Sequence, residues 1–121
     1  MTCRVLLVED EGGTREAVAQ ALVEAGYDVT AACTGDEAAI LFGPPEDFDL
    51  LLTDVVTPGR TNGVELAGHA RERHPGLPVL FLSGRPEEAA RTECVQKPRS
   101  SVAKPVDARG VLGAVGRLMG R

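Results

Sequence analysis

The chain has 121 residues, which suits one domain with its own hydrophobic core, so residues 1–121 are expected to form a single domain without an output domain. Its net charge is −5 and its basic residues are scattered, which argues against nucleic-acid binding. No apolar stretch could span a bilayer, so a membrane segment is not expected. Met1 leads straight into a predicted strand, so a signal peptide is not expected either, and a cytoplasmic location is favoured.

The first predicted unit is a strand followed by a helix. The apolar run 5–8 predicts a buried strand, and the acidic sequence Glu9-Asp10-Glu11 follows it. Thr14 is the expected N-cap of the helix, and Gly26 is the residue expected to end it. The apolar face of this helix is predicted to consist of Ala17, Val18, Ala21, Leu22 and Ala25.

The second and third units follow the same alternation. Residues 27–33 predict a second strand, and the sequence from Thr34 to Glu37 fits a capping box that begins a short helix ending at Phe42. Residues 43–45, Gly-Pro-Pro, break that helix. The apolar run 50–53 then predicts a buried strand that ends in Asp54, and a helix is expected after Asn62-Gly63 up to about His74.

The last two units complete the series. Residues 79–82 predict a strand that ends in Ser83, and residues 86–94 predict a short, weakly amphipathic helix. A last short strand is expected to end at Lys104, and Asp107 is expected to cap a final helix. The three cysteines lack CxxC spacing, so buried or half-buried thiols are expected rather than a zinc site or disulfides.

Five strand–helix units with near-continuous apolar strands indicate an α/β fold with a doubly wound parallel sheet. If the strands that end in Glu9 and Asp54 are neighbours, right-handed crossovers predict the strand order 2-1-3-4-5. The first and fifth helices would then lie on one face of the sheet. Ligands in such sheets bind at the carboxyl ends of the strands, which is where the acidic residues are expected.

The predicted strand ends bring several polar groups together. Glu9, Asp10 and Asp54 would place three carboxylates within a few ångströms, and like charges that close demand a cation or a raised pKa. A hard divalent ion such as Mg²⁺ suits a few carboxylates that leave room for waters and phosphate oxygens. A carboxylate beside Mg²⁺ can act as a nucleophile toward phosphorus, and Ser83 and Lys104 could each bind one phosphoryl oxygen.

At these residues the chain resembles the receiver domains of bacterial two-component response regulators. The resemblance covers essentially the whole chain and rests on VLLVEDE, DLLLTDVVTPGRTNGVEL, VLFLSG and AKPVDARGVLGAVGRL. It implies a flavodoxin-like fold with five helices, a phosphoryl group received on Asp54, and Mg²⁺ as the cofactor. It also implies that Asp10 binds Mg²⁺ directly, that Glu9 binds it through water and that Val56 binds it through its backbone carbonyl. The same resemblance makes Ser83 the switch hydroxyl and Lys104 the partner of the phosphoryl group.

Two Lys-Pro pairs compete for the role of the conserved lysine. Too few residues separate Ser83 from Lys97 for both a fourth helix and a fifth strand, whereas Lys104 leaves room for both. Lys104 is therefore preferred. The resemblance further implies a cis peptide at Lys104-Pro105, and a cis bond at Lys97-Pro98 would count against this choice.

The chain departs from the family pattern at two positions. Receiver domains usually carry an aromatic residue three positions before the conserved lysine, where this chain has Ser101, so the usual coupling of the site to the output face is in doubt. Thr57 stands where methionine is common. Val56 and Arg85 occupy positions that tune the lifetime of the phosphoryl group in the family.

The resemblance implies a signalling module rather than a turnover enzyme, with a sensor histidine kinase or a histidine phosphotransfer protein as its partner and a weak homodimer as an option. Alternatives are a degenerate receiver that acts by binding alone, an aspartate-nucleophile phosphatase and an FMN carrier. The phosphatase would need an acid where Val56 stands, and the FMN carrier would need a phosphate loop where Glu9-Asp10-Glu11 stands. The chain could be a free-standing regulator or a receiver excised from a hybrid kinase, which the sequence from Leu51 to Leu66 resembles.

Overall fold

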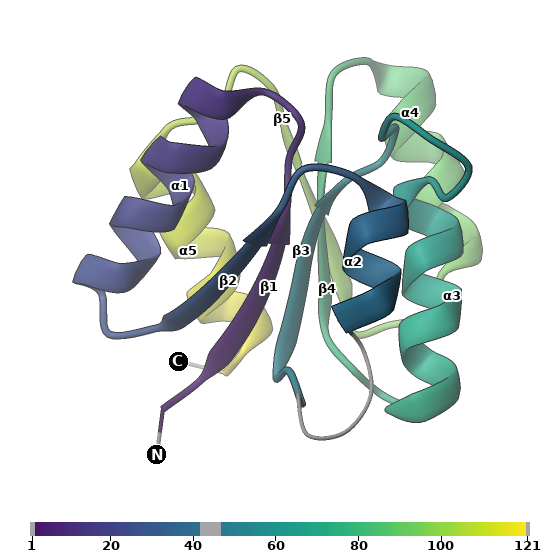
Figure 1. Cartoon of the computed structure of the whole chain (residues 1–121). Coiled ribbons are helices and arrows are strands. Elements are labelled where there is room, and N and C mark those ends of the chain that lie inside the picture. Colours follow the sequence, from purple (N-terminus) through teal and green to yellow (C-terminus); the bar gives the residue numbers. More distant parts are fainter. Residues whose placement is uncertain (1, 42–46, 121) are drawn as a thin grey trace.

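The computed structural model describes residues 2–41 and 47–120, which form a five-stranded parallel sheet with helices on both faces (Figure 1). The strand order is β2-β1-β3-β4-β5, as predicted. The strands are β1 (Arg4–Val8), β2 (Asp28–Ala32), β3 (Leu50–Asp54), β4 (Val79–Ser83) and β5 (Arg99–Ala103). The helices are α1 (Gly12–Glu24), α2 (Gly35–Leu41), α3 (Gly63–Arg73), α4 (Pro86–Arg91) and α5 (Ala108–Leu118), with a 3₁₀ turn η1 (Thr92–Cys94).

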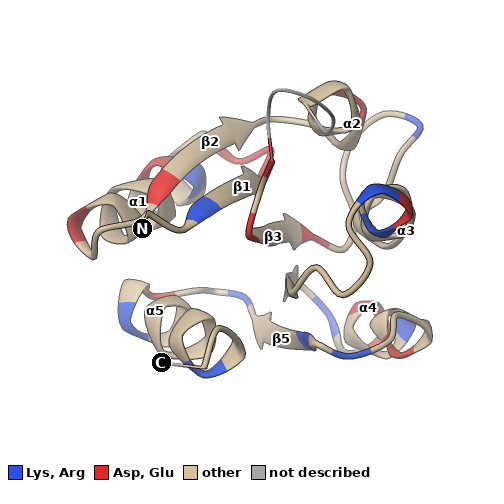
Figure 2. Ribbon diagram, turned by 90° about the horizontal axis from the view of Figure 1, so that it is seen from below, with Lys and Arg blue, Asp and Glu red and all other residues tan. Residues whose placement is uncertain are grey.

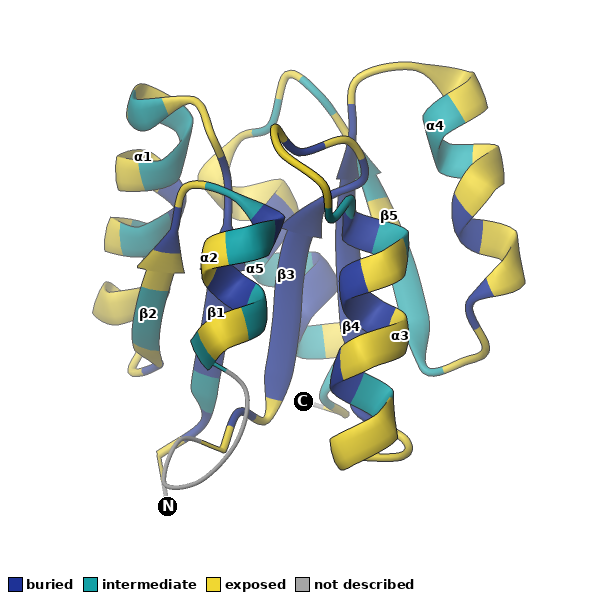
Figure 3. Cartoon of the chain, turned by 45° about the vertical axis from the view of Figure 1, so that its right-hand side comes forward, coloured by how far each residue is buried: buried dark blue, intermediate teal, exposed yellow. Residues whose placement is uncertain are grey.

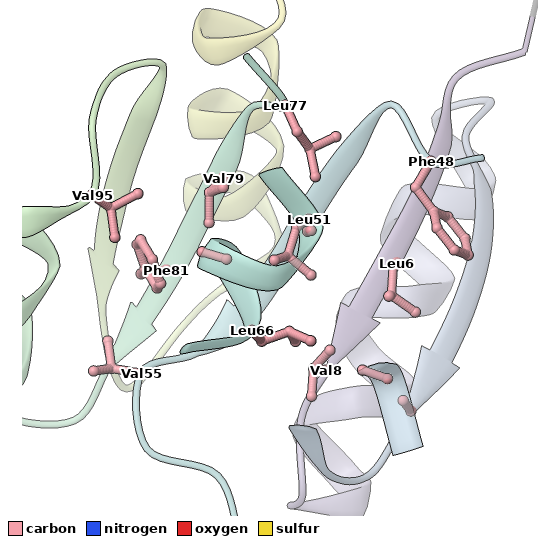
Figure 4. Packing of buried hydrophobic residues seen from close by; sticks show 14 residues of the cluster. Leu6, Val8, Phe48, Leu51, Val55, Leu66, Leu77, Val79, Phe81 and Val95 are labelled. Carbon is pink, nitrogen blue, oxygen red and sulfur yellow. The ribbon is translucent and has the colours of Figure 1, made fainter. Parts of the chain in front are cut away.

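The helices divide between the two faces as predicted: α1 and α5 cover one face, and α2, α3 and α4 lie on the other (Figure 1). All five residues of β3 and of β4 are buried between these layers (Figure 3). Side chains of alternating strand residues pack into two separate clusters, and Figure 4 shows the one beneath α2 and α3. Each fully buried leucine or valine contributes about 1.5–3 kcal/mol, so the two central strands fix the position of the carboxyl-end residues.

Caps at helix N-termini confirm most of the predicted boundaries. Asn62 and Glu65 form a complete capping box on α3, and Asp107 caps α5 by accepting from the Gly110 amide at 2.7 Å. The Thr34 hydroxyl accepts from the Glu37 amide at 3.0 Å at the start of α2. The predicted end of α2 at Phe42 and the break at residues 43–45 lie outside the described residues.

The predicted N-cap of α1 was wrong. The helix begins at Gly12, and Glu11 caps it by accepting from the amides of Gly13 and Thr14 at 3.0 and 2.6 Å. Thr14 instead donates its hydroxyl to Glu11 at 2.6 Å. The Glu11 carboxylate reaches the amides of Gly13 and Thr14, so the helix begins three residues earlier than a Thr14 cap would place it and closer to the acidic cluster.

Three further expectations need correction. The fourth helix ends at Arg91 rather than Cys94, because the chain tightens into the 3₁₀ turn η1 at Thr92. None of the residues of this helix is buried. On α1 only Val18 and Leu22 of the predicted apolar face are buried. Cys3 is buried, but Cys33 and Cys94 are exposed free thiols. In the part of the chain that the structure describes, every helix is too short or too polar to span a bilayer.

Candidate functional site

The predicted polar residues meet at the carboxyl end of the sheet. Glu9 directly follows β1, Asp54 ends β3, Ser83 ends β4 and Lys104 follows β5. The pairing of β1 with β3 and of β3 with β4 sets the first three side by side. The Lys104 amide donates to the Ser83 carbonyl at 2.8 Å, which continues the β4–β5 pairing by one residue and brings the lysine to the same edge.

Lys104 lies between two buried carboxylates. Its Nζ is 2.8 Å from Glu9 Oε1 and 2.9 Å from Asp54 Oδ1. The Glu9 side chain is fully buried and that of Asp54 is 4% exposed, whereas that of Lys104 is 29% exposed. The place of Lys104 at the site supports its choice over Lys97, which is exposed and lines a separate cleft beside α3.

The expected cis bond does not distinguish the two lysines. Both Lys97-Pro98 and Lys104-Pro105 are cis in this structure. The cis bond predicted at Lys104-Pro105 is confirmed. The cis bond at Lys97-Pro98 is the observation that was expected to count against Lys104 as the conserved lysine. The two ion pairs of Lys104 favour Lys104, because Lys97 makes no comparable approach to the acidic residues that the structure describes, and the assignment stays a prediction.

The acidic cluster has the predicted membership. One carboxylate oxygen from each of Glu9, Asp10 and Asp54 lies within 4.8 Å of the others, with Asp10 exposed and the other two buried. Asp54 Oδ2 is buried and has no hydrogen-bond donor among the described residues. Two buried acids facing one ammonium leave negative charge without neutralisation, and oxygen atoms are the ligands that Mg²⁺ prefers. The residues present therefore fit a divalent cation.

The pKa values of the two buried acids shift in opposite directions. Burial raises the pKa of Asp54 to about 8, and the facing Glu9 carboxylate adds to that shift, while Lys104 opposes it. Burial alone would raise the pKa of Glu9, but its contacts with Asp54, Lys104 and the Glu11 amide hold that pKa below the ordinary value. Partial burial would lower the pKa of Lys104, but the two carboxylates hold it above its usual range. The metal-free site thus favours the protonated form of Asp54 over that of Glu9.

Two supports of Glu9 were missed in the sequence. The Glu11 amide donates to Glu9 Oε2 at 3.1 Å, and Arg15 Nη1 donates to the Glu9 carbonyl at 3.0 Å. Because both residues come from the first turn of α1 and its cap, that turn anchors the acidic loop. The sequence signal for the second of these contacts is an arginine six residues after the glutamate.

The remaining predicted residues lie near the site without a described contact to it. Ser83 is buried at the end of β4, one residue beyond Leu82, which pairs with Asp54. The Val56 side chain is half exposed, and the use of its carbonyl as a ligand stays a prediction. Ser101 is exposed on β5 beside the buried Phe81, so the reduced coupling expected from the missing aromatic stays a prediction as well.

This site has a direct consequence for stability in the absence of metal. The pKa of Asp54 is about 8 in the folded state against 3.8 for a free carboxyl, so the folded protein binds the extra proton between these values. The associated stability is present at low pH and is lost as the pH rises toward 8. We expect Asp54→Asn to gain stability relative to wild type from pH 5 to pH 8, by at most about 1.4 kcal/mol per pH unit.

Urea unfolding in EDTA at several pH values measures this difference. Asp49→Asn is a suitable control, because Asp49 is an exposed acid outside the cluster, at the other end of β3. Parallel pH profiles for wild type and Asp54→Asn would show that Asp54 has an ordinary pKa.

Comparison with known proteins agrees with this arrangement. The sequence model of the response regulator receiver domain matches residues 5–115. The response regulator receiver protein CpdR of Brucella abortus is 34% identical over 118 residues, which cover 96% of each chain. The response regulator protein FleR of Pseudomonas aeruginosa is 35% identical over 118 residues, but these cover 97% of this chain and only 24% of FleR. A crystal structure of a response regulator receiver protein from Sinorhizobium medicae superposes with a TM-score of 0.88 at 26% identity, covering 98% of this chain and 95% of that one.

Proposed function

The chain belongs to the receiver domain family of two-component response regulators, and on that premise we propose that it accepts a phosphoryl group on Asp54. The observation that carries the proposal is the pairing of Lys104 with two buried carboxylates at the carboxyl edge of the sheet. Burying acids is costly unless they are used or fully paired, and here Asp54 Oδ2 has no donor among the described residues. This oxygen is the proposed nucleophile.

Each residue of the site would have its own role in the phosphoryl transfer. An ionised Asp54 oxygen would attack the phosphorus of a phosphohistidine, the phosphorus–nitrogen bond would break, and the histidine nitrogen would leave with the electron pair and take up a proton. Lys104 would pair with one phosphoryl oxygen, and the Ser83 hydroxyl would donate to another. The protein thus supplies position and charge, and the phosphoryl group remains on its own side chain.

A divalent cation completes this chemistry. Glu9, Asp10, Asp54 and the Val56 carbonyl would hold Mg²⁺, with Glu9 acting through water. The ion would neutralise negative charge on the phosphoryl oxygens when bound. A cation beside Asp54 would also lower the pKa of that residue from its metal-free value of about 8, so the carboxylate would be ionised and reactive at neutral pH.

The partner and the product state follow from the same proposal. The phosphodonor would be a sensor histidine kinase or a histidine phosphotransfer protein, and the phosphorylated domain would switch conformation rather than turn over a substrate. Val56 stands where an aspartate-nucleophile phosphatase needs its general acid, which supports a signalling module over a phosphatase. The cytoplasmic location, the weak homodimer and the single-domain organisation stay predictions.

A small phosphodonor tests the proposal. Wild-type protein incubated with acetyl phosphate and Mg²⁺ should gain the mass of one phosphoryl group in intact mass spectrometry. The gain should disappear in EDTA and in Asp54→Ala, because the cation or the nucleophile is missing. Asp49→Ala should be modified like wild type. If the wild type stays unmodified under conditions that modify another receiver domain, the chain is a degenerate receiver that acts by binding alone.

A further inference from the structure

The loop between β3 and α3, residues 55–62, is fastened to the start of α2. Asp36 Oδ2, from the first turn of α2, accepts a hydrogen bond from the Arg60 amide at 3.0 Å across 24 residues of sequence. The bond from the Arg60 amide, together with hydrogen bonds from Thr61, holds the pKa of Asp36 below its ordinary value. The carboxylate is therefore ionised at neutral pH, and a charged acceptor makes a stronger hydrogen bond than a neutral one.

Close backbone packing strengthens the same junction. A Cβ atom at Gly35 would collide with the Thr61 carbonyl, and one at Gly59 would collide with the Asp36 carboxylate. Gly59 also has a φ of +93°, which favours glycine. Within the loop, the Thr57 hydroxyl donates to the Thr61 carbonyl at 2.5 Å. The two helices α2 and α3 lie side by side on this face, so the loop between β3 and α3 rests against both (Figure 3).

The fastened loop begins with the residues proposed to bind the metal. Val56 follows Asp54 by two residues, and its half-exposed side chain shows that packing of that side chain does not hold the loop in place. The Val55 amide is bonded to the Leu82 carbonyl and the Gly63 amide to the Val55 carbonyl, which fix the two ends of the loop. Between these ends, Asp36 supplies a hydrogen bond from outside the loop, to the Arg60 amide.

We propose that Asp36 is a positioning residue for the metal site, which holds the loop so that the Val56 carbonyl is available as a ligand. This inference rests on the proposed function, since it assigns a role to a residue that does not itself contact the metal. Residues that orient metal ligands commonly change metal affinity about 10–100-fold when they are replaced. A purely structural role would instead lower the stability of α2 and leave metal affinity unchanged.

Titration calorimetry with Mg²⁺ separates these roles. Asp36→Ala removes the acceptor and a charge, whereas Glu37→Ala removes a charge from the same exposed turn without losing a described contact of its side chain. We expect Asp36→Ala to raise the Mg²⁺ dissociation constant about tenfold relative to Glu37→Ala. Asp36→Asn keeps an acceptor oxygen and should restore most of the affinity. At saturating Mg²⁺, Asp36→Ala should still accept the phosphoryl group from acetyl phosphate.

Each outcome bears on one part of the account. Equal dissociation constants for Asp36→Ala and Glu37→Ala would overturn the positioning role, and so would a failure of Asp36→Asn to recover. Urea unfolding of the same variants checks that all are folded, which we expect because the lost hydrogen bonds lie near the surface and contribute only modestly to stability. A wild-type protein that binds no Mg²⁺ at all would contradict the metal site itself, and the role of Asp36 with it.

Discussion

Lys104→Met should destabilise the metal-free protein by about 2–3 kcal/mol at pH 8. The ammonium pairs with Glu9 and Asp54, and removing one partner of a buried pair typically costs about 3–5 kcal/mol. We expect less here because the Lys104 side chain is 29% exposed and its charge is partly screened by water. The loss of stability caused by Lys104→Met should be smaller at pH 5, because both carboxyls can take up protons there. Urea unfolding in EDTA at both pH values measures it.

Lys97→Met is the matched control. Lys97 also precedes a proline in a cis bond, but it is exposed and far from the acidic cluster in sequence and fold. Its replacement should change the free energy of unfolding by less than about 0.5 kcal/mol at either pH. Equal effects of the two substitutions would show that Lys104 contributes little to the charge balance of the site. The destabilised Lys104→Met protein should regain stability when Mg²⁺ is added.

Magnesium should stabilise the wild-type protein strongly and the Asp10→Asn variant weakly. An ion that binds only the folded state adds about 2.7 kcal/mol at a concentration a hundredfold above its dissociation constant. Asp10 is the exposed member of the acidic cluster, so its loss should weaken metal binding without leaving a cavity. Without metal, Asp10→Asn should be as stable as wild type or more stable, because one like charge is gone.

Thermal melting with and without Mg²⁺ tests this prediction. Glu16→Gln is a suitable control, since Glu16 is an exposed acid on α1 outside the cluster and its replacement should leave the response to Mg²⁺ intact. Wild-type melting curves that superimpose with and without the ion would mean that the acidic cluster is a solvated surface.

Local sequence patterns were sufficient to predict the sheet, and they indicated the residues that are proposed to form the site. Apolar runs such as Leu50–Leu52 fit only a strand buried on both faces, and the chain order of the units then leads to the observed strand order. Because parallel strands bring their carboxyl ends to one edge, Glu9, Asp54 and Lys104 could be grouped without coordinates. In the structure, the two ion pairs of Lys104 bring these three side chains together.

Contacts that depend on side-chain reach or on long-range packing could not be predicted in this way. Glu11 displaced Thr14 as the cap of α1 because its longer side chain reaches the first amides, although threonine is the commoner choice. The bond between Asp36 and the Arg60 amide joins residues 24 positions apart, and no local pattern indicates it. The pKa of about 8 for Asp54 depends first on burial and then on the facing Glu9, and only the folded arrangement reveals either cause.

Locating the added phosphoryl group within the chain tests the central claim most directly. Wild-type protein treated with acetyl phosphate and Mg²⁺ can be reduced with borohydride, which converts an acyl phosphate into a stable alcohol, and then digested and sequenced by mass spectrometry. We expect one modified residue, Asp54, and we expect the label to be lost when hydroxylamine treatment precedes the reduction. A label on Glu9, on Asp10 or on a hydroxyl such as Ser83 would contradict the assignment of Asp54 as the phosphoacceptor.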